Sequence, residues 1–184
     1  TTGTLAGAGI IQSNAGTVVE SGGTLTPGNN LGQTVGTLSF MSYLELQAGS
    51  TTVFQLSGAT GTVINPFVID SPLLNGTPGN HDHLDINGSL TLGVSSLIQI
   101  RLSGYTAGFG DVFNLIDWTT LGNATANGFD PETDIDFSDA ALDFGLAWET
   151  DRFLSDGIIY VAPEPSRSLL LLTGLLLTLC RRRR

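Results

Sequence analysis

The sequence predicts an all-β protein that ends in a single short hydrophobic helix. Glycine followed by a hydroxyl residue recurs before short aliphatic or β-branched runs, and glycine readily adopts the backbone conformations of tight turns. Alternation of apolar and polar residues, as in Leu44-Glu45-Leu46 and Leu90-Thr91-Leu92, is typical of a strand with one buried face. No run before Pro163 sustains the period of about 3.6 residues that marks a helix, so we expect helix to be rare there.

Near-repeats in residues 1–60 indicate a parallel β-helix or solenoid-like architecture. The repeated segments are "GTLAGAG", "GTVVESGGTL", "GTLSF" and "GSTTVFQLSG", and "GSLTLG" follows the same formula from Gly88. They recur at about 12 to 20 residues, and each rung of a solenoid buries its apolar face by stacking on a neighbour. Asn14, Asn29 and Asn30 suit the corners of such rungs, because asparagine tolerates the left-handed region. The same strands and turns also permit an antiparallel β-sandwich, which stays open as the alternative.

Longer strands are expected in the second half of the chain. The segments that predict them are "HLDINGSLTL", "SSLIQIRL", "DVFNLIDW" and "GIIYVA". Tyr105, Trp118, Trp148 and Tyr160 lie within apolar runs, so we assign them to the core and not to a surface that stacks on sugars.

Charge is distributed unevenly along the chain. The first 165 residues hold all 17 acidic side chains and two arginines, a net charge of −15, whereas the last 19 residues carry +5. Such an acidic body repels nucleic acid and anionic lipid, so we expect no nucleic-acid partner. The only cysteine is Cys180, so the body can form no disulfide. We expect an export signal and further rungs upstream of Thr1, since a bare solenoid end leaves strand edges unpaired.

The tail begins at Pro163-Glu164-Pro165, which predicts a stiff, exposed and unpaired spacer. The apolar segment that follows, residues 168–180, is about 20 Å long as a helix, shorter than a bilayer core of about 30 Å. The anchor residues that we predict are Leu169, Leu170, Leu171, Leu172, Leu175, Leu176 and Leu177, followed by Arg181, Arg182, Arg183 and Arg184. The terminal arginines favour a short transmembrane helix with its C-terminus in the cytoplasm over a buried core helix. We therefore divide the chain into a β-rich domain, residues 1–162, and a tail, residues 163–184.

The order of proline-glutamate-proline, leucine helix and terminal arginine cluster resembles the PEP-CTERM sorting signal of bacterial exported proteins. This resemblance implies a membrane-embedded exosortase that cleaves near the motif and delivers the body to the cell surface or exterior. Within residues 16–161, "GGTLTPGNNLG", "HDHLDINGSLTLG" and "GDVFNLIDW" are similar to the passenger-type repeats of autotransporter-like surface proteins. This second resemblance implies a parallel β-helix or a related β-rich surface domain without known catalysis.

The segment "HDHLD" has the H-x-H-x-D spacing of metallo-hydrolase metal sites. His81, His83 and Asp85 are its candidate ligands, but the chain has only two histidines, too few for a two-metal site. The competing interpretation is a strand in which Leu84 and Ile86 point inward and His83 and Asp85 point outward. That strand would end in a turn at Asn87-Gly88.

The segment "DPETDIDFSDAALD" gathers carboxylates, which calcium prefers as ligands. An EF-hand loop is excluded, because Ile135 occupies the position that requires glycine. A looser calcium site and a solvated acidic loop both stay open, and we commit to no cofactor. Ser138 is expected to cap one helical turn that runs through Leu142.

The function expected from these features is that of a non-enzymatic exported surface or matrix protein. The chain lacks a Gly-x-Ser-x-Gly elbow, a P-loop and a dinucleotide fingerprint. The expected partners are the membrane and an exosortase-type protease through the tail, with extracellular polysaccharide as a further candidate. The alternative is a carbohydrate-active enzyme or glycan-binding module on a β-helix, although nothing in the sequence selects a catalytic pair of carboxylates.

Overall fold

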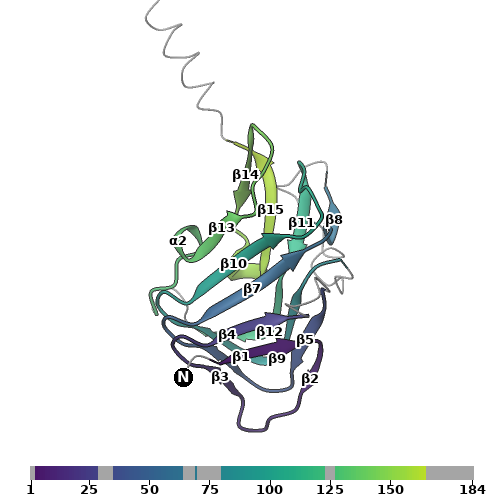
Figure 1. The fold of residues 1–184 in the computed structure, drawn as a ribbon. Helices are drawn as coiled ribbons and strands as arrows, with labels where there is room; N and C mark the ends of the chain where they lie inside the picture. Colours follow the sequence, from purple (N-terminus) through teal and green to yellow (C-terminus); the bar gives the residue numbers. More distant parts are fainter. Residues whose placement is uncertain (1–2, 29–34, 64–68, 70–79, 123–126, 165–184) are drawn as a thin grey trace, which may run out of the picture.

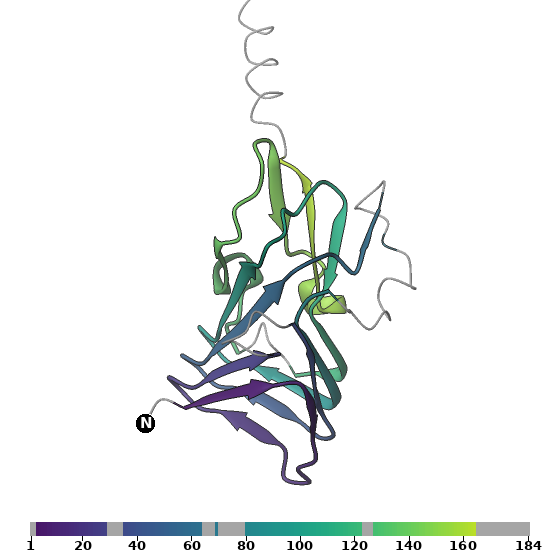
Figure 2. The ribbon, with the colours of Figure 1, turned by 45° about the vertical axis from the view of Figure 1, so that its right-hand side comes forward.

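Parallel β-sheets dominate the computed structural model, which describes residues 3–28, 35–63, 69, 80–122 and 127–164. Strands from distant parts of the chain lie side by side in two parallel sheets, and a third, antiparallel sheet lies at the end of the molecule opposite β1, β2 and β3 (Figures 1 and 2). The prediction of a mostly β chain with little helix is confirmed, since the helices among the described residues are single four-residue turns.

The first parallel sheet has the strand order β1-β4-β7-β10-β13. Its strands are β1 (Thr4–Gly7), β4 (Thr24–Pro27), β7 (Thr51–Leu56), β10 (Leu97–Leu102) and β13 (Ile135–Asp139). Register aligns one inward position in all five strands, the column Leu5, Leu25, Thr52, Ile98 and Ile135. This column is buried except at its first member, Leu5, which has no strand on its outer side among the described residues.

The second parallel sheet is built around the long strand β9 (His83–Leu92). Its other strands are β2 (Gly9–Ile11), β3 (Thr17–Val19), β5 (Thr37–Phe40), β6 (Leu44–Leu46) and β12 (Ile116–Leu121). The first half of β9 pairs with β5 and the second half with β6, and β12 follows β9 on its other side. The chain therefore passes alternately through the two parallel sheets, and successive passes stack on one another.

The antiparallel sheet has the order β14-β15-β11-β8. Its strands are β8 (Gly61–Thr62), β11 (Asp111–Asn114), β14 (Leu146–Glu149) and β15 (Ile158–Pro163). Two short helices are present: α2 (Pro131–Asp134) lies between β12 and β13 of the parallel sheets, and α3 (Phe153–Asp156) connects β14 to β15 within the antiparallel sheet. β15 contributes five buried residues, so this sheet closes one end of the core.

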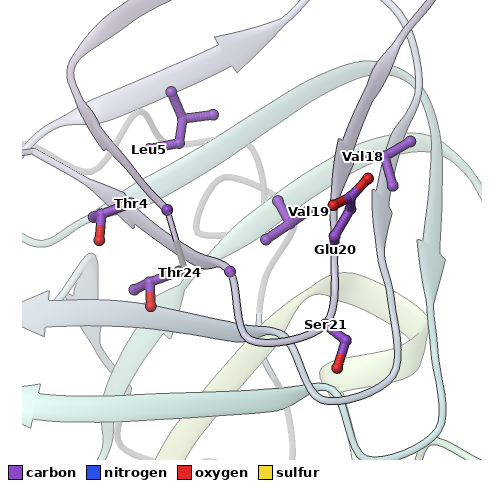
Figure 3. A pocket seen from close by; sticks show the side chains of 9 residues that line it. Thr4, Leu5, Val18, Val19, Glu20, Ser21 and Thr24 are labelled. Carbon is purple, nitrogen blue, oxygen red and sulfur yellow. The ribbon is translucent and has the colours of Figure 1, made fainter. Parts of the chain in front are cut away.

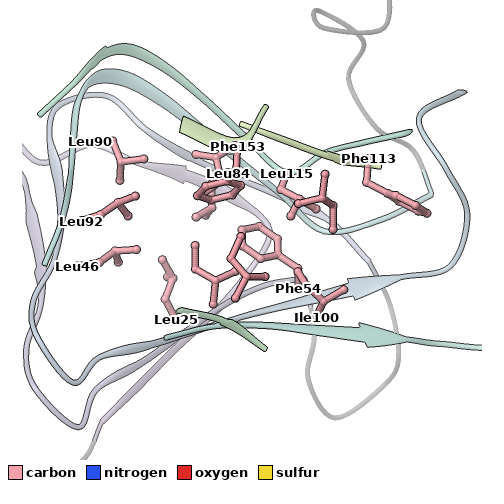
Figure 4. Packing of buried hydrophobic residues seen from close by; sticks show 14 of the residues in the cluster. Leu25, Leu46, Phe54, Leu84, Leu90, Leu92, Ile100, Phe113, Leu115 and Phe153 are labelled. Carbon is pink, nitrogen blue, oxygen red and sulfur yellow. The ribbon is translucent and has the colours of Figure 1, made fainter. Parts of the chain in front are cut away.

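The core lies between the two parallel sheets and extends to the antiparallel sheet (Figure 4). Side chains in register form columns, one of which contains Ile11, Phe40, Ile86 and Trp118. Toward the antiparallel sheet the core becomes aromatic, and Phe113 has ring contacts with His81, Tyr105 and Trp148. The assignment of Tyr105, Trp118, Trp148 and Tyr160 to the core is confirmed, since Tyr160 is buried and the other three pack against buried residues.

Pairing between strands supports some expectations about the repeats and corrects others. An antiparallel sandwich does not describe the two larger sheets, in which every strand pair of the described chain is parallel. The expected repeat of about 12 to 20 residues was too short, because Thr4 pairs with Thr24 but Thr51 pairs with Leu97. Connections between strands can lengthen at little free-energy cost while the stacking register is kept.

Asn14 lies in a turn between β2 and β3, as expected for a corner, but the left-handed residue beside it is Gly16, with φ of 75°. No turn forms at Asn87-Gly88; both lie within β9, and a Cβ at Gly88 would come within 2.6 Å of Ser42 O. The close approach of these two backbones explains the glycine better than a turn does. Asn29 and Asn30 lie outside the described residues.

Ser138 caps no helix; it lies in β13, next to the exposed end of that strand. The helix forms earlier, at α2, where the Asp130 side chain accepts a hydrogen bond from Glu132 N and Pro131 occupies the first turn. An N-cap aspartate followed by proline is a strong helix-start signal, which the sequence interpretation passed over.

Candidate functional site

The segment His81-Asp82-His83 is buried at the junction of the parallel and antiparallel sheets. It follows the isolated bridge between Leu56 and His81 and enters β9 at His83. Leu84 and Ile86 are buried and Asp85 is exposed, as the strand interpretation predicted. His83 was expected to point outward, and this was wrong, because its side chain lies under β11 and β12.

His81 is held as a neutral imidazole by its two hydrogen-bond partners. Its Nδ1–H donates to Asp82 O at 2.9 Å, so Nε2 accepts from the Thr60 hydroxyl at 2.6 Å. Burial lowers the pKa of His81 to about 4. Thr60 and His81 form the kind of hydrogen bond that joins a nucleophile to its general base in enzymes. A base with a pKa of about 4 is weak at neutral pH, however.

Asp82 ties two separate segments to β9. Its carboxylate accepts backbone N–H groups from Gly36, just before β5, and from Gln55 in β7, each at 2.9 Å. Burial raises the pKa of Asp82 to about 7 despite these two hydrogen bonds, which favour the charged form. The side chain thus links the two parallel sheets through the backbone.

His83 and Asn114 form the second half of the same polar network. His83 Nδ1 donates to Asn114 O at 3.0 Å, and His83 Nε2 lies 3.4 Å from Asp117 Oδ2. Asn114 N donates to the Thr60 hydroxyl at 3.0 Å, and Asn114 Nδ2 donates to Asp117 Oδ1 at 3.1 Å. Together with His81 and Asp82, these residues form what we call the junction network.

The H-x-H-x-D residues do not converge on a common point. Asp85 is exposed and accepts a hydrogen bond from Ser39 at 3.2 Å, whereas both histidines bond to buried groups on other strands. Over the described ranges, the structure contains no group of three or more His, Cys, Asp or Glu side chains suited to a metal ion. The spacing therefore reflects strand entry.

A second polar centre, around Asp111, was missed by sequence reasoning. Asp111 accepts hydrogen bonds from Thr62 Oγ1 at 2.9 Å, Tyr105 OH at 2.5 Å and Gly108 N at 2.7 Å. Burial, together with the bond to Asp111, raises the pKa of Tyr105 to about 12. No motif could have revealed this centre, because Thr62 reaches Asp111 only through the antiparallel pairing of β8 with β11.

Most carboxylates of the segment at residues 130–143 bond to nearby backbone or to arginine. Asp134 accepts a hydrogen bond from Asp130 N at 2.9 Å, and Asp139 pairs with Arg101 at 3.3 Å. Hydrogen bonds from Ser138 hold the pKa of Asp136 below its usual range. The carboxylates thus act as local caps and an ion-pair partner.

An acidic hollow of about 300 Å³ lies beside this segment, between α2 and β14. Glu132, Glu149 and Asp151 line it, together with Phe137 and Trp148. Partial burial, with the charges of Asp151 and Glu132, raises the pKa of Glu149. The Trp148 ring stacks on Phe137 at 5.1 Å and also contacts Phe113, so both rings are engaged within the protein.

Another hollow, of about 310 Å³, lies at the N-terminal end of the parallel sheets. Figure 3 shows its lining, in which Leu5, Val18 and Val19 lie near Glu20 and two threonines. It is formed by β1 and β3 together with the segment that leads into β4. Sequence analysis identified no hollow here.

At the start of the tail, Pro163 and Glu164 are exposed, as expected, but they are not unpaired. Pro163 is the last residue of β15 and pairs with Leu146, and Glu164 N donates to Gly145 O at 3.0 Å. A proline is tolerated at this strand end because its missing N–H is not needed in the ladder. Pro165, the leucines at 169–172 and 175–177 and the arginines at 181–184 lie outside the described residues. No helix within the described part of the chain has the length and apolar character to cross a bilayer.

Comparisons of the chain with protein-family models, with curated proteins and with solved structures found no match. The function is therefore inferred from the sequence and structure of the chain.

Proposed function

We propose that the chain is a non-enzymatic exported protein whose body is a β-solenoid displayed at the cell surface or in the matrix. The observation that carries the proposal is the stacking of successive strands in two parallel sheets. In addition, His81 and His83 both make hydrogen bonds to backbone carbonyl groups inside the protein. Each pass through β1 to β12 would form a rung, and the antiparallel sheet would close one end of the stack. The acidic body stays soluble and repels other polyanions.

Delivery in this proposal depends on the tail. The Pro163-Glu164-Pro165 motif would be cleaved by an exosortase-type protease after the leucine helix and Arg181 to Arg184 have held the chain in the inner membrane. Cleavage at this motif is supported by the exposure of Pro163 and Glu164 at the C-terminal end of β15, where a protease can reach the chain.

Mass spectrometry of the secreted and membrane fractions tests this proposal. We expect the secreted form to end near residue 165, and we expect replacement of Arg181 to Arg184 by serine to reduce its amount. The control is Arg101→Ser with Arg152→Ser, which removes positive charge at two partly buried side chains outside the tail. Secreted protein that still carries Arg184 would refute processing.

The acidic hollow favours one second candidate, a carbohydrate-active site with Glu149 as general acid, because its pKa is raised. Against this candidate, the neighbouring Trp148 and Phe137 rings stack on each other and not outward. Reducing-end assays on extracellular polysaccharides, with Glu149→Gln and Glu20→Gln as matched variants, distinguish the two functions. Hydrolysis lost only in Glu149→Gln would favour the enzyme over the display protein.

A further inference from the structure

Two phenylalanine side chains of the antiparallel sheet's turns lie in solvent. Phe144 is fully exposed, and Phe109 is 46% exposed. Of the other phenylalanines that the structure describes, five are buried and Phe137 packs against the core. A phenylalanine is usually buried where a core is available, so two exposed rings in one part of the molecule indicate a contact with something outside the body.

The two turns that carry these rings have the same construction. They are residues 108–111, which read Gly-Phe-Gly-Asp, and residues 143–146, which read Asp-Phe-Gly-Leu. In each, the last N–H donates to the first C=O, at 3.1 and 3.2 Å respectively. The phenylalanine is the second residue of each turn and a glycine the third, with φ of 82° at Gly110 and 86° at Gly145. Because glycine adopts this conformation without strain, both turns hold a phenylalanine at the tip.

Both turns lie at the end of the sheet where β15 ends. β11 and β14 flank β15 and run antiparallel to it, so the turn that precedes each of them lies beside the C-terminal end of β15. Gly110 N donates to Val161 O at 2.9 Å, and Glu164 N donates to Gly145 O at 3.0 Å. Figures 1 and 2 show the turn before β14 and the start of β11 at this end of the molecule. The two rings therefore belong to the face from which the chain continues into the tail.

This face is close to the apolar segment of the tail along the chain. The first leucine of that segment, Leu169, follows Glu164 by five residues. An extended chain spans at most about 3.5 Å per residue, so Leu169 lies within about 18 Å of Glu164. In the proposed function this segment is in the membrane, which brings the face with Phe109 and Phe144 to the lipid surface.

We propose that Phe109 and Phe144 insert into the membrane interface beside the anchored tail and hold the body against the lipid before cleavage. The inference rests on the membrane anchoring in the proposed function. Phenylalanine is among the side chains with which peripheral proteins enter the boundary between headgroups and acyl chains. Two rings bind lipid weakly by themselves, but a short tether gives them a high effective concentration at the surface. Cleavage removes the tether, so the body then leaves the membrane.

The charge of the body determines which lipid suits this contact. The first 165 residues have a net charge of −15, and Asp143 and Glu164 lie next to the Phe144 turn. Anionic headgroups would repel these carboxylates. The contact is therefore apolar, and it is strongest on a zwitterionic surface such as phosphatidylcholine.

Tryptophan replacements combined with brominated lipid test the proposal. The full chain is reconstituted into phosphatidylcholine vesicles as Phe144→Trp or Phe109→Trp, and the fluorescence of the wild type, whose Trp118 and Trp148 pack against the core, is subtracted. We expect brominated phosphatidylcholine to quench each added tryptophan at least twofold more than in the matched control Val94→Trp. Val94 is 51% exposed and lies in the turn between β9 and β10, outside the antiparallel sheet. Equal quenching in all three variants would overturn the proposal, as expected if the rings dock a protein and not lipid.

Flotation of the same vesicles distinguishes failure of this inference from failure of the proposed function. Chain that does not float with the vesicles would refute anchoring by the tail, and this inference with it. Chain that floats while the tryptophan of Phe144→Trp is quenched no more than that of Val94→Trp would refute the inference alone.

A second substitution tests whether the two rings act together. Added to Phe144→Trp, Phe109→Asp should reduce the quenching by half or more, because a carboxylate is unfavourable at the boundary with the acyl chains. Val94→Asp, the control for added negative charge, should leave the quenching unchanged. A reduction in both double variants, or in neither, would contradict a contact made by the two turns together.

Discussion

The two ends of the parallel sheets carry similar apolar residues but differ in what covers them. At the N-terminal end, Leu5 and Ile10 are exposed, whereas at the other end Phe153 of α3 and Ile159 of β15 are fully buried. Along the chain, residues 1–69 contain two acids, Glu20 and Glu45, whereas the other fifteen acids and both body arginines lie later. The difference teaches that stacking in register does not by itself complete a core, because the last strand always needs a separate cover.

The largest effect is expected at Gly157, where β15 leaves α3 to close the covered end. Gly157 has φ of 72°, and an added Cβ would come within 1.8 Å of Ile116 O. Gly145 has φ of 86° but nothing near its Cβ position. Gly157→Ala should lower the free energy of unfolding by about 3 kcal/mol or more, against about 1 to 2 kcal/mol for Gly145→Ala. Urea unfolding followed by tryptophan fluorescence measures both; equal losses would contradict the steric account.

Substitutions at Leu25 and Leu5 compare the stability contributed by a buried and an exposed side chain of the same column. Leu25→Ala should cost about 2 to 5 kcal/mol, because it leaves a cavity under β1, and Leu5→Ala less than about 1 kcal/mol. Denaturation midpoints at low protein concentration provide the test. A comparable loss at Leu5 would mean that the open end is already covered.

The junction network makes stability depend on pH through two opposing groups. Since Asp82 has a folded pKa of about 7, above its unfolded value of 3.8, its contribution is present at acidic pH and is lost as pH rises toward 7. His81 acts in the opposite direction, since its pKa of about 4 lies below 6.5 and stability is gained as pH rises between these values. Asp82→Asn should therefore give stability that rises more steeply from pH 4 to 6.5 than in the wild type. Urea midpoints across this range test the slope, and an unchanged slope would exclude a titrating Asp82.

The smallest effect is expected for the ion pair of Arg101 with Asp139, which joins β10 to β13 at the surface. Both side chains are about half exposed, so Arg101→Ala should change the free energy of unfolding by less than about 1 kcal/mol. The effect should also shrink in high salt. A loss that is larger, or that salt leaves unchanged, would show that Arg101 acts through packing of its aliphatic stem.

The success of the sequence interpretation differed between local and long-range features. Alternation correctly placed Leu84 and Ile86 inside β9, because period-two patterning is a property of the strand alone. The same pattern placed His83 outside, and this was wrong because β11 and β12 cover that part of the sheet and supply Asn114 and Asp117 as partners. Likewise, Gly88 was interpreted from its dipeptide as a turn, whereas its role is set by the close approach of Ser42, in the connection between β5 and β6.

By itself, the sequence determined that this chain is mostly β, that Tyr105, Trp118, Trp148 and Tyr160 belong to the core and that its charge is concentrated away from the N-terminus. Those properties follow from composition and short-range periodicity, which act within a few residues. Only the tertiary structure decided that the larger sheets are parallel, that Asp82 connects Gly36 to Gln55 and that the antiparallel sheet covers one end of the core. These depend on which distant strands become neighbours, and pairing between strands is settled by the packing of the whole core.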